Sequence, residues 1–200
     1  MRERQIFIGD VLFVVCCAFY LAWWVLAFRP VGAAGGIGSS PAGELQTGWL
    51  LIPASFAGLW GVILIIWGVA MRKREVRLIP GLYILLGGVA AYFILLAVTA
   101  LLFKRPATSE LILITGFCML MLAEVNALYG SGVFSRDTSV GLFILIGAVT
   151  VISLICYVLY FPLNGRSALA GYVDGMIPLL LAGLTTAGLA VAIAVRGTGG

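Results

Sequence analysis

Six long runs of apolar residues, separated by short polar breaks, make up most of this chain of 200 residues. A helix needs about 20 apolar residues to cross the ~30 Å hydrocarbon core of a bilayer. The pattern therefore predicts an all-α integral membrane protein, a six-transmembrane-helix bundle. We expect a single transmembrane domain over residues 1–200, with spans at about 6–28, 49–70, 78–103, 111–129, 139–161 and 172–195.

Composition agrees with this class and narrows the chemistry. The chain is 62% hydrophobic and only 10% charged, which no soluble domain of this size matches. It has no histidine, and its four cysteines all fall inside predicted spans without a CxxC pair. We therefore expect no metal site, no His-ligated haem and no other cofactor. Motifs of hydrolases and metalloproteases are missing, so no enzyme is predicted, although an intramembrane enzyme stays open.

The basic residues predict the orientation. They fall mainly on the side of the N-terminus, and cytoplasmic loops carry the excess of Lys and Arg. We predict three helical hairpins, made of spans 1–2, 3–4 and 5–6, with both termini in the cytoplasm and the protein in a cell inner membrane. The net charge of +4 is then a topology signal and not a sign of nucleic-acid binding. The N-terminal side would hold Arg2, Arg4, Arg72, Lys73, Arg74, Arg77, Arg136 and Arg196, and the other side Arg29, Lys104, Arg105 and Arg166.

The first apolar stretch is interpreted as a true span and not as a signal peptide. It is longer than the 7–15 residues typical of the apolar part of such a peptide, and Asp10 interrupts it.

Two prolines lie inside predicted spans. Pro53 and Pro178 each remove one backbone hydrogen bond, so we expect a helix kink at both positions. They also share the pattern I-P-x-x-x-A-G-L, at 52–59 and 177–184, which indicates either an internal duplication or chance in a Gly- and Leu-rich chain. The kinks could open a cavity between helices or serve packing alone. Pairs with small-xxx-small spacing, such as Gly87/Ala91 and Gly183/Ala187, are expected to pack helices together within the chain.

Acidic residues within spans are the first candidates for function. Glu124 lies about a turn and a half from the inner end of the fourth span, and Asp10 lies at a similar depth in the first. Because a charge at such depth costs free energy, it is often functional. The hypothesis is an ion- or proton-coupling site formed by Glu124 and Asp10, with Asn126 nearby. The alternative is structural pairing of the two acids with the basic loop at 71–77.

A second candidate site lies at the other membrane boundary. Asp174 falls just inside it, four residues before Pro178, and aromatic residues are concentrated at the same level. One interpretation is an aromatic belt with snorkelling cations. The other is a pocket that binds a small polar solute, lined by Asp174, Arg166, Tyr172 and Trp24.

In overall plan the chain resembles the substrate-binding subunits of energy-coupling-factor vitamin transporters. The resemblance covers the size, the six helices and the Ala-x-x-x-Ala spacing of Ala18 and Ala22, which in that family contacts the coupling subunit. It includes no vitamin-specific motif, and we assign no family. It implies a partner membrane or ATPase subunit; a homo-oligomer is the other assembly considered.

The sequence thus predicts a small polytopic inner-membrane protein that binds or translocates a small solute, as a transporter, a substrate-binding subunit or a channel. The contrasting hypothesis is a membrane scaffold, anchor or regulatory subunit of a larger complex. A cavity that reaches Asp174 or Glu124 would favour transport.

Overall fold

The computed structural model describes residues 2–27, 47–71, 77–103, 108–164 and 168–197. Within these ranges the chain is helical and has no strand. The elements are α1 (Arg2–Ala27), the short 3-10 helix η1 (Gly48–Leu50), α3 (Leu51–Ala70), α4 (Gly81–Phe103), α5 (Thr108–Gly130), α6 (Arg136–Asn164) and α7 (Ala168–Gly197).

Six of the described helices are long and apolar enough to cross a membrane, which confirms the predicted class of multi-pass α-helical membrane protein. The apolar segments are Arg4–Ala27, Gly48–Ala70, Gly81–Leu101, Leu111–Gly130, Arg136–Tyr160 and Leu169–Arg196. Several helices extend beyond the predicted spans. By contrast, α4 begins at Gly81 and not at 78, because Pro80 disfavours helical geometry at the residue before it.

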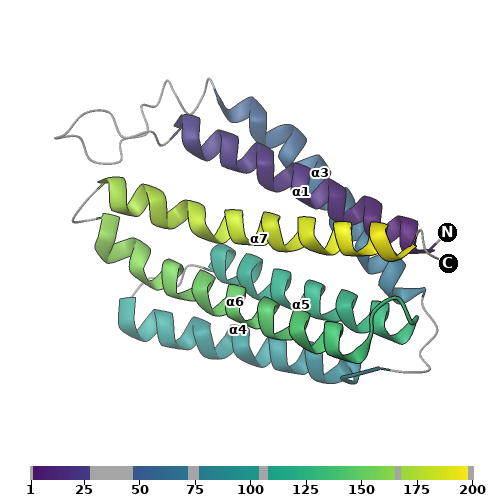
Figure 1. Cartoon of the computed structure of the whole chain (residues 1–200). Coiled ribbons are helices and arrows are strands. Elements are labelled where there is room, and N and C mark those ends of the chain that lie inside the picture. The colour runs from purple at the N-terminus through teal and green to yellow at the C-terminus, as the bar shows by residue number, and fades with distance from the viewer. Residues whose placement is uncertain (1, 28–46, 72–76, 104–107, 165–167, 198–200) are drawn as a thin grey trace.

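The helices run roughly along one common direction, and both chain termini lie at the same end of the bundle (Figure 1). We call this end, with Ile6 and Ile193, the termini end, and the opposite end, with Trp24 and Asp174, the far end. Helix α1 packs against α3 and α7, α7 packs against α6, and α5 packs against α3, α4 and α6. Helix α4 has α5 as its main neighbour and is the most exposed of the six.

Glycines bring α1 and α3 into close contact. A methyl group on Gly61 would lie 2.9 Å from the carbonyl oxygen of Gly9 and 3.1 Å from the backbone nitrogen of Phe13. One on Gly68 would lie 2.5 Å from Cγ1 of Ile6. Because backbone meets backbone at Gly9 and Gly61, only glycine fits there, and α1 and α3 form one closely packed pair.

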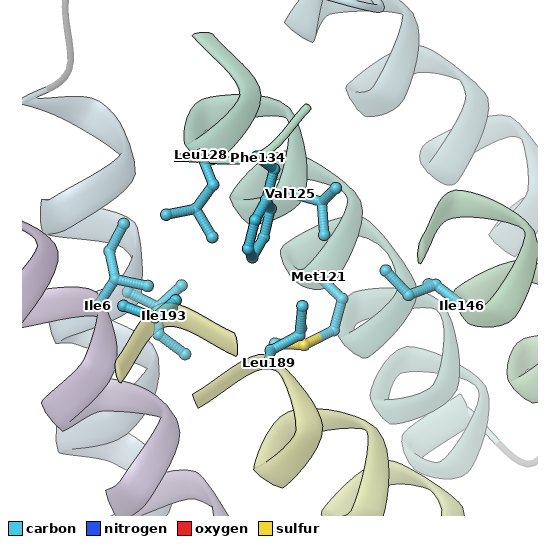
Figure 2. Packing of buried hydrophobic residues seen from close by; sticks show 9 residues of the cluster. Ile6, Met121, Val125, Leu128, Phe134, Ile146, Leu189 and Ile193 are labelled. Carbon is cyan, nitrogen blue, oxygen red and sulfur yellow. The ribbon is translucent and has the colours of Figure 1, made fainter. Parts of the chain in front are cut away.

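The apolar core lies toward the termini end, where α1, α3, α5, α6 and α7 converge (Figure 2). It also includes the turn between α5 and α6. The buried cluster consists of Ile6, Ile65, Met121, Val125, Leu128, Phe134, Ile146, Leu189 and Ile193.

The turn after α5 folds back onto this core. Gly132 has φ of 77°, in the left-handed region that glycine adopts without strain. The amides of Val133 and Phe134 then donate to the carbonyl of Leu128, at 3.1 and 3.4 Å, and the ring of Phe134 is buried. Ser135 accepts from the amide of Thr138 through Oγ at 3.3 Å, which caps the start of α6.

Candidate functional site

Asp10 of α1 and Glu124 of α5 meet inside the bundle. Both side chains are fully buried, and their carboxyl groups lie close enough to interact. Each residue lies six positions from the termini end of its apolar segment, Arg4 or Gly130, which is about 9 Å along a helix. The sequence placed the two acids at a similar depth; the tertiary structure brings them into contact.

A hydrogen bond between two carboxyl groups requires a proton on one of them, because a carboxylate only accepts. No amide or hydroxyl of the described residues donates to the oxygens of Asp10. None of the buried polar side chains in this part of the chain is basic. Two adjacent carboxylates repel each other strongly in a low-dielectric interior, so the geometry favours a pair that shares one proton.

Apolar layers enclose the pair on both sides. Toward the termini end, one turn from each acid, lie Ile6 of α1 and Leu128 of α5, both fully buried in the core (Figure 2). Toward the far end, the ring of Phe13 stacks on that of Phe117, with centroids 5.8 Å apart. The pair is therefore shielded from both ends of the bundle.

Asn126, the third residue of the predicted coupling site, binds elsewhere. Its Oδ1 accepts from the amides of Leu78 and Ile79, at 2.9 and 3.3 Å, and its Nδ2 donates to the carbonyl of Ile79 at 2.7 Å. These three bonds satisfy the irregular backbone that leads into α4. The side chain of Asn126 thus ties α5 to this segment, while Glu124 lies beside Asp10.

At the far end, Asp174 of α7 faces α6. Its side chain is 7% exposed and shares a hydrogen bond with the thiol of Cys156. The second carboxylate oxygen, Oδ2, is buried and has no hydrogen-bond partner in the described part of the chain. Cys156 is also buried, with only 6% of its surface exposed. Sequence reasoning missed Cys156, because a cysteine in an apolar run gives no signal of the helix that it faces.

Trp24 and Tyr172 are brought together next to Asp174. The indole Nε1 of Trp24 donates to the backbone carbonyl of Tyr172 at 3.2 Å, so Trp24 of α1 reaches α7. Its ring lies against Gly175, where a methyl group would come within 2.5 Å of Cζ2. On the other side, the ring of Tyr160 on α6 lies 6.4 Å from that of Trp24.

The remaining predicted residues are the two prolines and the cations, and only some of them lie within the described residues. Pro178 lies inside α7, as expected. Pro53 is the third residue of α3, in the first turn after η1, where proline is well tolerated and needs no kink. Arg166 lies outside the described residues, and so do the cations Arg72, Lys73 and Arg74 of the basic loop.

An apolar groove of about 370 Å³ lies between α1 and α3 and does not reach either acidic site. Its lining consists of Leu12, Val15, Phe19, Pro53, Phe56, Ala57 and Trp60. Within the described ranges, no three His, Cys, Asp or Glu side chains are grouped as metal ligands would be. Ala18 and Ala22 are exposed on α1.

Comparisons of the chain with protein-family models, with curated proteins and with solved structures return no match.

Proposed function

We propose that the protein binds or translocates a small solute across a cell inner membrane, with Asp10 and Glu124 as the pair that carries the coupling proton. The close approach of two fully buried carboxyl groups, one on α1 and one on α5, is the observation that supports this proposal most. Ionisable groups within membrane spans are expensive to bury, and in pumps and transporters such groups form proton relays.

The position of the pair between helices supports a coupling role. Asp10 belongs to the α1–α3 pair, which the glycine contacts hold closely together, whereas Glu124 belongs to α5. A movement of α1 and α3 as one body relative to α5 would separate the carboxyl groups and the Phe13–Phe117 stack. Separation would admit water and release the shared proton, and such movement of one helix group against another is the usual basis of alternating access.

The orientation is part of the proposal. Both termini lie at one end of the bundle, which is consistent with an even number of spans (Figure 1). The excess of Lys and Arg on that side supports a cytoplasmic location of both termini and three hairpins, α1–α3, α4–α5 and α6–α7. The coupling pair then lies about 9 Å from the cytoplasmic ends of α1 and α5.

Proton release in proteoliposomes tests the proposal. The full chain is reconstituted with a pH-sensitive dye inside, and solutes from a panel of amino acids, sugars and alkylamines are added outside. We expect at least one solute to change the internal pH, and Asp10→Asn and Glu124→Gln to reduce this change at least tenfold. Asp137→Asn is the matched control, because Asp137 is an exposed acid in the first turn of α6.

If the panel produces saturable uptake of a solute with no pH change, the solute-binding role stands and the proton role of the pair is wrong. If both acidic variants behave like the Asp137→Asn control, the pair is structural.

A scaffold or anchoring subunit is the second candidate, and the exposure of α4 favours it. Only 6% of its apolar segment is buried, and large side chains such as Leu82, Phe93 and Leu101 face outward. The α1–α3 groove offers a second apolar surface to a partner helix. Native mass spectrometry of the protein in mild detergent discriminates the two functions, because a stable foreign membrane subunit without a bound solute supports the scaffold.

A further inference from the structure

The far end of the bundle holds unsatisfied hydrogen-bond acceptors on a single residue. Oδ2 of Asp174 has no hydrogen-bond partner among the described residues, and the residue is more than nine-tenths buried. A buried polar group without a partner is rare in folded proteins, and the binding of an ion or water is one of the accepted reasons for it.

Pro178 adds a second acceptor at the same place. In an α-helix the amide of residue i donates to the carbonyl of residue i−4, and proline has no amide hydrogen. Because Pro178 lies inside α7, the backbone carbonyl of Asp174 lacks its helical donor. Residue 174 therefore has two oxygens that can each accept a further donor, Oδ2 of the carboxylate and the backbone carbonyl oxygen.

Aromatic rings lie beside these acceptors. The ring of Trp24 rests on Gly175, the residue next to Asp174. The centroid of the Tyr160 ring lies 6.4 Å from that of the Trp24 ring. The faces of Trp and Tyr attract organic cations. Among the described residues the carboxylate interacts with the thiol of Cys156, and a thiol is a weak donor without positive charge.

We infer that the far end binds a protonated amine, with its ammonium group donating to Oδ2 and the backbone carbonyl of Asp174 and its alkyl part lying against Trp24. A primary or secondary ammonium fits better than a quaternary one, because two acceptors call for N–H donors. This inference rests on the proposed solute-binding function and names its substrate class.

Isothermal titration calorimetry of the purified full chain in detergent tests it, with n-butylammonium as the probe. We expect saturable binding with one site per chain. Tetramethylammonium, which lacks N–H donors, and n-butanol, which lacks the charge, should each bind at least tenfold more weakly. Asp174→Asn should weaken n-butylammonium binding at least tenfold, since the amide retains the shape and removes the charge.

Gly175→Ala provides a second variant that leaves the carboxylate unchanged. Its methyl group would displace the ring of Trp24, so n-butylammonium should bind several-fold more weakly. Asp137→Asn is again the matched control and should bind like the wild type. The thermal midpoint of each variant without ligand, followed by tryptophan fluorescence, establishes that it is folded.

Each other result overturns a defined part. Equal affinity for n-butylammonium in the wild type and in a folded Asp174→Asn variant excludes the site, and equal affinity for tetramethylammonium excludes the N–H donor model. The amine site and the acid pair lie on opposite sides of the Phe13–Phe117 stack, and each is tested by its own readout. Amine binding without a pH change in proteoliposomes supports the amine site and excludes the coupling role of the acid pair. Proton movement with another solute, together with no amine binding, supports the coupling pair and excludes the amine site.

Discussion

Phe13 of α1 stacks on Phe117 of α5, with ring centroids 5.8 Å apart and an angle of 25° between the planes. The stack lies three residues beyond Asp10 along α1 and seven residues before Glu124 along α5. Because the two helices run in opposite directions, both offsets point toward the far end. The stack therefore separates the acid pair from the cluster around Asp174 and Trp24.

The acid pair predicts a dependence of stability on pH. Two adjacent buried carboxyl groups are stable together only when one of them holds a proton, which an acid loses as the pH rises. We expect the thermal midpoint of the wild type in detergent, followed by tryptophan fluorescence, to fall as the pH is raised. Asp10→Asn should reduce this fall, because the amide of asparagine donates to Glu124 at any pH. Parallel curves for the wild type and Asp10→Asn would show that the pair holds no titrating proton.

Replacement of Asn126 should cause a structural defect without a functional one. Asn126→Ala removes three hydrogen bonds and leaves the amides of Leu78 and Ile79 without their partner. We expect a loss of about 1–3 kcal/mol in the free energy of unfolding, measured by denaturation in mixed micelles. The proton signal of the folded fraction should not change. A selective loss of that signal, with normal stability, would instead support the predicted coupling role of Asn126.

The contact between α1 and α3 predicts a contrast between two glycines. Gly61→Ala would force a methyl group against the backbone of α1, so we expect destabilisation by about 1–3 kcal/mol. Gly87→Ala on α4 meets nothing within 4 Å and should leave stability unchanged or raise it by up to about 1 kcal/mol. Thermal midpoints of the two variants measure this, and equal shifts would contradict the close packing of α1 and α3.

The contacts of Arg196 at the termini end should stabilise the fold by a small amount. Its guanidinium lies 5.5 Å from the centroid of the Phe134 ring and donates to the carbonyl of Val133 at 3.4 Å and to Oγ1 of Thr138 at 3.3 Å. We expect Arg196→Ala to cost about 0.5–1 kcal/mol, because the site is exposed. Hydrogen exchange of residues 131–138 should rise in this variant, whereas exchange in α4 should not.

The apolar pattern alone was sufficient for the class of the protein. Six runs of apolar residues, each long enough to cross a bilayer, can satisfy their backbone only as helices, so the number and type of elements followed from the sequence. Helix ends were less predictable, since local features such as Pro80 shifted the start of α4.

Which face of each helix meets which neighbour was not predictable. Almost every residue in a span is apolar, so hydrophobicity does not distinguish a buried face from a lipid-facing one. Gly87 fitted a small-xxx-small pattern and lies in open space, whereas Gly9 and Gly61, which were not singled out, bring the backbones of α1 and α3 together.

The candidate sites show the same division. The sequence determined that Asp10, Glu124 and Asp174 are the acids of interest, because a charge is rare and expensive within an apolar span. Only the tertiary structure decided that Asp10 lies beside Glu124, that Asn126 binds the segment before α4, and that Asp174 faces Cys156. Which residues of different helices meet depends on how those helices are rotated and packed. The sequence of a single span determines neither.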